Sequence, residues 1–179
     1  MNSLSYALLA MLARKPCSGY ELAKMMEVFW QAKHSQIYPL LSKLEEQSYL
    51  TAENVEQTGK PNKKIYSITE TGKEILRKWL PRLPALPVTR DEFLIKAYAI
   101  SLTDPMTFKR LIDNRIEHYK NLNEARIEKI HDIHERNGGV PEFGHVEFGR
   151  YIVHQRKLQM EQEEITWCSW VLEILGNTY

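Results

Sequence analysis

The chain has 179 residues, of which 43% are hydrophobic and 26% charged, the proportions of an ordinary globular protein. No segment approaches the roughly 18 apolar residues of a membrane span, and the start Met1-Asn2-Ser3-Leu4 lacks the features of a signal peptide, so we expect a cytoplasmic protein. The net charge is only +1, but the first 80 residues carry a basic excess, which is compatible with a nucleic-acid-facing first half.

Three helices are predicted first. An apolar stripe at helical spacing indicates a helix from Leu4 to Arg14. Ser18 followed by Glu21 is the pattern of a capping box, which starts a second helix that ends near Val28. The third helix is expected to begin near Gln36, because Pro39 is tolerated in a first turn and not later.

A hairpin and a fourth helix follow. Residues 49–55 are typical of a strand, the Gly, Pro and Asn of 57–62 predict a turn, and 64–68 alternate as a returning strand does. Thr69 is placed to cap a helix that runs through Leu80. Helix, helix, helix and hairpin in this order predict a mainly α fold that opens with a winged helix-turn-helix and its two-stranded wing.

Prolines at 81, 84 and 87 interrupt the chain, because a helix interior does not tolerate them. We therefore expect a DNA-binding domain over 1–82, a proline-rich linker over 83–89 and a helical domain over 90–179. Helices are predicted in the last part over 91–101, from 104 to 136, and from 142 to 175.

The final helix carries an apolar recurrence every seven residues, which predicts a helix–helix seam between two copies of the chain. Packing of this stripe against the preceding helix of its own chain is the competing interpretation. A contribution of the first helix to the dimer is also expected. The candidate interface residues are Leu4, Leu8, Tyr151, Leu158, Ile165 and Leu172.

The third helix and the hairpin turn together predict DNA binding. A helix fits the major groove, where base edges are distinguishable, and a glutamine can pair with adenine through two hydrogen bonds. Lysines in the turn would contact phosphates, although a solvated basic turn is the alternative. The predicted contacts are Lys33, His34, Ser35, Gln36, Tyr38, Pro39, Ser42 and Lys43 from the helix region and Lys60, Asn62, Lys63 and Lys64 from the hairpin.

These residues resemble the phenolic-acid-decarboxylase regulator (PadR) family. The matching stretches are 8–12, 18–22, 37–45, 59–61 and 64–72, and Arg90–Lys96 with the helices after it resembles the AphA-like (virulence activator alpha) subfamily. The resemblance implies a homodimer on a two-fold symmetric operator and, in some members, a response to phenolic or hydrophobic small molecules. Family members often have a small pair such as Gly-Thr where this chain has Ser35-Gln36, so we expect a different base preference.

Other functions are less well supported by the sequence. We find no nucleophile motif, phosphate-binding glycine loop or paired carboxylates, and we predict neither an enzyme nor a cofactor. Cys17 and Cys168 are interpreted as packed thiols, and His131 and His134 as solvated residues, with no metal site. A winged-helix adaptor that does not bind DNA and a regulator that senses hydrophobic ligands stay open as alternatives.

Overall fold

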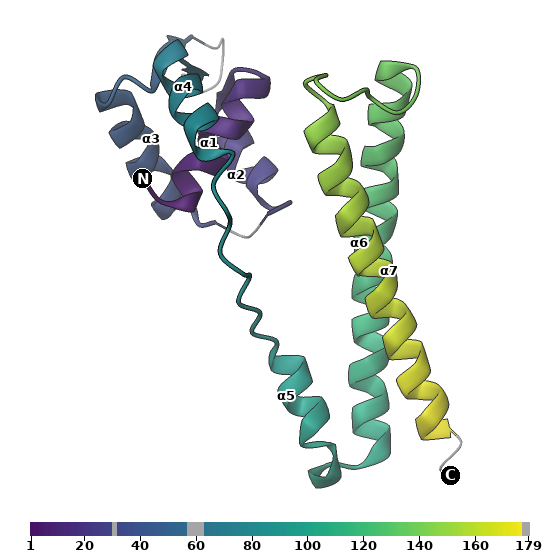
Figure 1. The fold of residues 1–179 in the computed structure, drawn as a ribbon. Helices are drawn as coiled ribbons and strands as arrows, with labels where there is room; N and C mark the ends of the chain where they lie inside the picture. Colours follow the sequence, from purple (N-terminus) through teal and green to yellow (C-terminus); the bar gives the residue numbers. More distant parts are fainter. Residues whose placement is uncertain (30–31, 57–62, 177–179) are drawn as a thin grey trace. The chain divides into compact units, whose positions relative to one another are not determined.

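The computed structural model describes residues 1–29, 32–56 and 63–176, so the predicted contacts Lys60 and Asn62 lie outside the described residues. The chain forms two compact units, Met1–Ala85 and Leu86–Tyr179, and each is described by itself. Figure 1 shows the helices of both units. The predicted class, mainly α with a winged helix-turn-helix first and long helices after it, is confirmed.

The first two helices of the first unit begin at side-chain caps. The side chain of Asn2 accepts a hydrogen bond from the Ser5 amide and starts α1 (Ser3–Arg14). The predicted capping box is present at α2 (Gly19–Met26): Glu21 accepts from the Ser18 amide at 2.8 Å, and Ser18 Oγ accepts from the Glu21 amide. The third helix, α3, spans His34–Glu46.

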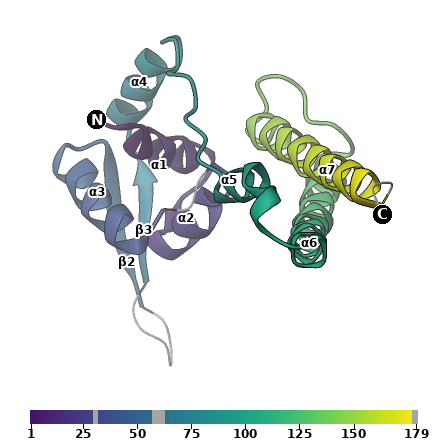
Figure 2. The same cartoon turned by 90° about the horizontal axis from the view of Figure 1, so that it is seen from below.

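The sheet has one strand more than expected. The wing strands β2 (Leu50–Val55) and β3 (Lys63–Ile68) pair antiparallel, and β1 (Cys17–Ser18) pairs with the other edge of β3. A two-residue strand is too short to show alternation, so the sequence carried no signal for it. Figure 2 shows the hairpin extending beyond the helices of its unit.

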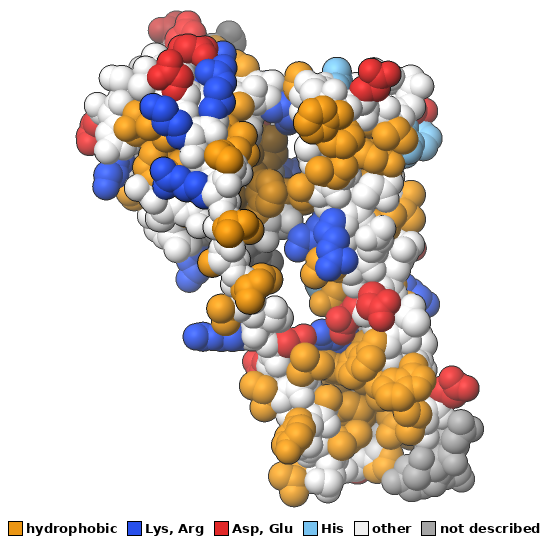
Figure 3. Space-filling model, in the orientation of Figure 1, with side chains coloured by type: hydrophobic (Ala, Val, Ile, Leu, Met, Phe, Trp, Pro, Cys, Tyr) orange, Lys and Arg blue, Asp and Glu red, His pale blue; other side chains and the backbone are white. Residues whose placement is uncertain are grey.

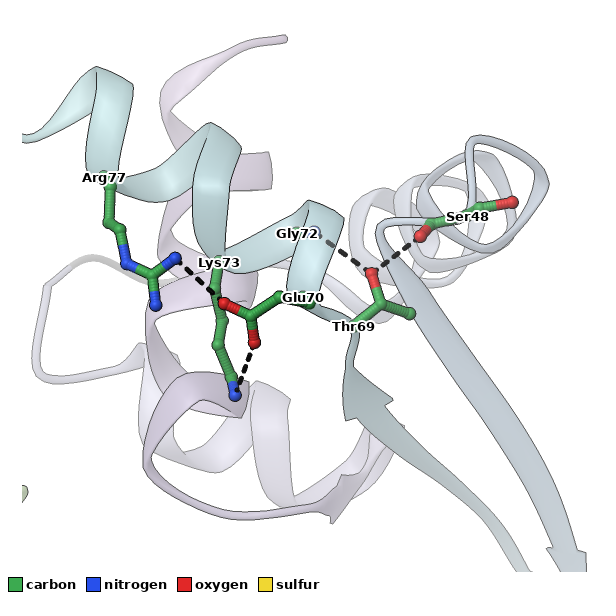
Figure 4. Close-up of polar contacts among 6 residues, drawn as sticks. All are labelled: Ser48, Thr69, Glu70, Gly72, Lys73 and Arg77. Carbon is green, nitrogen blue, oxygen red and sulfur yellow. Dashed lines mark hydrogen bonds and ion pairs between the residues drawn. The ribbon is translucent and has the colours of Figure 1, made fainter.

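Hydrogen bonds of Thr69 connect the segment after α3 to the start of α4 (Glu70–Trp79) (Figure 4). Thr69 Oγ1 donates to the Ser48 carbonyl at 2.7 Å and accepts from the Gly72 amide at 3.0 Å. A Cβ on Gly72 would lie 2.1 Å from the Tyr49 carbonyl oxygen, so this approach of two backbones requires glycine. These contacts fix where the chain passes from α3 into β2.

The core of the first unit is built from one face of each helix together with the sheet. Fully buried side chains include Leu8 from α1, Leu22 from α2, Leu41 from α3 and Leu50 from β2. The ring of Tyr6 on α1 stacks on Trp79 of α4 with centroids 4.5 Å apart. Burial of these apolar faces holds α3 in place.

The second unit contains α5 (Glu92–Tyr98), a 3-10 turn η1 (Ile100–Leu102), α6 (Pro105–Asn137) and α7 (Phe148–Gly176). Helices α6 and α7 pack along each other as an antiparallel hairpin (Figures 1 and 2). Helix α6 ends at Asn137, as the glycines and proline after it predict, and Gly138 caps it with a left-handed φ of 67°.

The start of α7 differs from the sequence expectation. The pattern predicts a helix from Glu142, whereas the helix begins at Phe148. Gly144 has a φ of 94°, which a right-handed helix cannot contain, and residues 142–147 therefore form a turn.

The hairpin has a polar centre. On α7 the buried side chains are His154, Glu161 and Cys168, three positions beyond the predicted apolar stripe. Arg126 of α6 donates to Glu161 through Nη2 at 2.6 Å, and its Nη1 lies 3.1 Å from His154 Nδ1. Burial, together with the charge of Arg126, lowers the pKa of His154 to about 4. The intramolecular seam is thus fixed in part by ionic contacts.

In the described part of the chain, no helix combines the length and hydrophobicity that crossing a membrane requires.

Candidate nucleic-acid interface

Helix α3 has one buried and one exposed face. Ile37, Leu41 and Leu44 are buried against the core of their unit. The predicted contacts of this region all lie on the solvent-exposed side: Lys33, His34, Ser35, Gln36, Tyr38, Pro39, Ser42 and Lys43. The structure thus brings the predicted helix residues together on one accessible surface with hydroxyl, amide, aromatic and basic groups.

The start of α3 is two residues earlier than the proline pattern predicted. Gln36 Oε1 accepts a hydrogen bond from the Lys33 amide at 3.1 Å and so closes the first turn before His34. Pro39 therefore lies in the second turn, where it supplies no amide for the Ser35 carbonyl. In this conformation the side-chain oxygen of Gln36 is engaged by the helix cap.

Three stacked aromatic rings extend this surface onto α2. The His34 ring stacks between Tyr20 and Tyr38, with centroids 6.3 Å and 6.0 Å away. Tyr20 is 66% exposed. A Cβ on Gly19 would lie 2.6 Å from the Tyr38 ring, so glycine allows this ring to rest against α2. Sequence patterns did not reveal Tyr20, because only the fold places the first turn of α2 beside α3.

The end of β3 that adjoins the turn of the wing is held by two ion pairs. Lys63 Nζ lies 3.2 Å from Glu21 of α2, and Lys64 Nζ lies 2.8 Å from Glu45 of α3. The hydrogen bonds from Ser18, with a smaller contribution from Lys63, lower the pKa of Glu21 to about 2. Lys63 thus lies beside α2 and Lys64 beside α3, and each has an acidic partner within the unit.

The candidate dimer residues have different surroundings. Leu4 and Leu8 are only 8% and 0% exposed, and they pack in the core of their own unit. On α7, Leu172 packs against the cluster around Phe108, and the Tyr151 ring lies 5.2 Å from His134. Leu158 and Ile165 are half-buried, which leaves part of each side chain for a partner.

Titratable groups do not assemble into a metal centre in the described residues, where no group of three or more His, Cys, Asp or Glu side chains could hold an ion. Cys17 and Cys168 are buried free thiols, and burial raises the pKa of both. Buried thiols of this kind are packing residues.

A helix-turn-helix in which α3 has an exposed polar face, followed by an antiparallel hairpin whose strand β3 begins with two lysines, defines the class of winged-helix proteins. Residues 8–78 match the model of the transcriptional regulator PadR-like family, and residues 89–176 match that of the virulence activator alpha C-terminal domain. The chain is 32% identical over 185 residues to the negative transcriptional regulator PadR of Bacillus subtilis, with 99% of this chain and 100% of that protein covered. The chain therefore belongs to the PadR-like family of transcriptional regulators.

Solved structures of the Bacillus subtilis PadR are also similar to this fold. The complex of that protein with operator DNA has a TM-score of 0.82 and 30% identity, with 98% of each chain covered. Its complex with p-coumaric acid has a TM-score of 0.71 and 30% identity, with 98% of this chain and 99% of that chain covered. The similarity extends over both units of the chain.

Proposed function

We propose that this chain is a sequence-specific DNA-binding regulator, and not an enzyme, that acts on chromosomal DNA in the cytoplasm. The observation that carries the proposal is the exposed face of α3, which presents Gln36, Tyr38 and Ser42 outward while the opposite face is fully buried. A helix supported in this way can enter the major groove and contact base edges. The operator-DNA complex of the Bacillus subtilis relative, which is similar over 98% of the chain, supports the same function.

Two copies would act together, with residues 1–82 binding DNA, 83–89 serving as the linker and 90–179 forming the dimer. The support comes from apolar side chains that the chain leaves exposed in its second unit. Helix α5 has no buried residue, and its apolar side chains are largely exposed: Leu94 is 50%, Ile95 70% and Tyr98 95% exposed. Figure 3 shows hydrophobic side chains gathered over α5 and the adjoining end of the α6–α7 hairpin. A second copy that covers this surface and the exposed parts of Leu158 and Ile165 would pair two recognition helices, and a symmetric dimer fits a symmetric operator.

Substitutions on α3 and in the wing test the proposal with different readouts. Gln36→Ala or Tyr38→Ala should relax preference at particular base pairs by about 1–3 kcal/mol. Replacing Lys60, Lys63 and Lys64 by Ala should weaken binding to all sequences and reduce the salt slope by up to about 0.9 for each phosphate that is no longer neutralised. Equal weakening of every operator variant by the α3 changes would assign those residues to the backbone, and an unchanged slope would remove the wing from the DNA.

A ligand-responsive regulator is the second candidate. The p-coumaric acid complex of a relative that is 30% identical supports it, because a phenolic acid would then be the chemical class of the effector. Titration with p-coumaric acid, followed by tryptophan fluorescence and by release of bound DNA, tests this response. Fluorescence quenching with DNA release would support it, and DNA binding that is unaffected at saturating acid would remove it.

An adaptor without DNA binding is tested by a separate measurement. Filter binding of pooled genomic DNA at two salt concentrations should show retention that falls as salt rises, because phosphate contacts release counterions. Absence of retention at both concentrations would favour the adaptor and contradict the proposed function.

A further inference from the structure

The first two residues of β3 connect the wing to both helices of the helix-turn-helix. Successive side chains of a strand point to opposite faces, so Lys63 and Lys64 diverge. Lys63 reaches Glu21 in the first turn of α2, and Lys64 reaches Glu45 in the last turn of α3. The turn end of β3 is thus tied to α3 on one face and to α2 on the other.

The Lys64 contact is the shorter of the two and has a second component. Its Nζ donates to Glu45 Oε2 at 2.8 Å and lies 5.4 Å from the centre of the Tyr66 ring, which is only 4% exposed. Two residues apart on one strand, Lys64 and Tyr66 share a face of the sheet. A carboxylate and a buried aromatic ring therefore hold an ammonium that would otherwise rotate freely.

We propose that Glu45 is a positioning residue for DNA binding, which aims Lys64, at the turn end of β3, at a phosphate beside the groove that α3 enters. This inference rests on the proposed function. The recognition helix and the wing must meet the duplex at a fixed separation, and a contact that sets this separation before binding lowers the entropy cost of association.

The alternative, in which Glu45 only repels phosphates, predicts a change in DNA affinity of the opposite sign when Glu45 is replaced. If Glu45 only adds negative charge near the phosphates, its removal should strengthen DNA binding, and any neighbouring carboxylate should behave in the same way. Glu46 supplies the matched control, because it is the next residue of the same helix and is exposed, and within the described ranges it forms no ion pair. Glu45→Gln and Glu46→Gln remove the same charge from adjacent positions.

The test uses the full chain and a duplex that the wild-type chain enriches from a random-sequence pool. Glu45→Gln should weaken binding by about two- to fivefold, the range that corresponds to an exposed ion pair. It should also reduce the salt slope by up to about 0.9, the value for one phosphate. Glu46→Gln should bind as tightly as the wild type or more tightly, with the slope unchanged. Thermal unfolding of each variant verifies that the fold is retained.

Substitution of Lys64 completes the cycle. Lys64→Met should abolish the same phosphate interaction, and adding Glu45→Gln to it should weaken binding no further. Lys64→Arg, which keeps the charge and the pairing, should restore wild-type affinity. Tighter binding by Glu45→Gln with an unchanged salt slope, or additive effects in the double variant, would overturn the positioning role of Glu45. Either result would leave the proposed DNA-binding function intact. Failure of the wild-type chain to enrich any duplex would overturn the proposed function together with the positioning role.

Discussion

Removing Arg126 tests how the α6–α7 hairpin is held. The side chains of Arg126 and Glu161 are only 11% and 6% exposed, and their charged atoms lie 2.6 Å apart. Arg126→Met would leave the Glu161 carboxylate buried without its cation. Breaking a buried pair in this way costs about 3–5 kcal/mol of unfolding free energy, because the remaining charge has neither water nor a partner.

The same helix offers a control with equal distance and different burial. Arg136 and Asp132 also lie 2.6 Å apart, but their side chains are 68% and 40% exposed. Arg136→Met should therefore cost less than about 1 kcal/mol. The double variant Arg126→Met, Glu161→Met removes both buried charges and should recover to within about 1 kcal/mol of the wild type, or exceed it.

The assay is urea denaturation at one fixed protein concentration, followed by circular dichroism at 222 nm and by tryptophan fluorescence. Fixed concentration matters because dimer dissociation would contribute to the midpoint. The reasoning is refuted if Arg126→Met and Arg136→Met are destabilised equally, or if the double variant is as unstable as the single one. Either result would mean that burial does not govern the energy of this contact.

Three further changes have expected outcomes. Gly72→Ala should lower the unfolding free energy by about 1–3 kcal/mol through overpacking, whereas Gly149→Ala, where a Cβ meets nothing within 4 Å, should be neutral or stabilising in thermal unfolding. As pH falls from 6.5 towards 4, the unfolded chain protonates His154 while the native side chain stays neutral, so the unfolding free energy should fall by up to about 3 kcal/mol. His154→Gln should flatten that part of the pH profile, and an unchanged profile would assign it to other groups. Charged substitutions at Leu158 and Ile165 should yield a folded monomer with weak DNA binding in sedimentation and binding assays; a folded variant that stays dimeric would exclude these residues from the interface.

Local chemistry allowed much of the fold to be predicted from sequence. The capping box at Ser18, the cap at Thr69 and the glycine after α6 act within a few residues of their own positions, so the chain order reveals them. Features that depend on distant partners were not visible. Strand β1 exists because Cys17 pairs with Tyr66, far along the chain.

The candidate site was predictable to a similar extent. The predicted contacts of α3 are all exposed, because the separation of an apolar face from a polar one follows from helical spacing in the sequence. The cap formed by Gln36, the stacking of Tyr20 and the pairing of Lys64 with Glu45 depend on side-chain directions and on contacts between elements. On α7, His154 and Glu161 are polar residues at helical spacing, and the sequence gives no reason for their burial. Their contacts with Arg126 of α6 supply that reason.

Selection of bound duplexes from a random-sequence pool tests the central claim most directly. A dimer that reads bases with two α3 helices should enrich one two-fold symmetric consensus, with half-sites about 10 or 20 bp apart. Enrichment should diminish at the positions read by Gln36 or Tyr38 when either residue is replaced by Ala. A pool that remains random while DNA is bound, or a consensus without symmetry, would contradict the account of a dimeric, sequence-specific regulator.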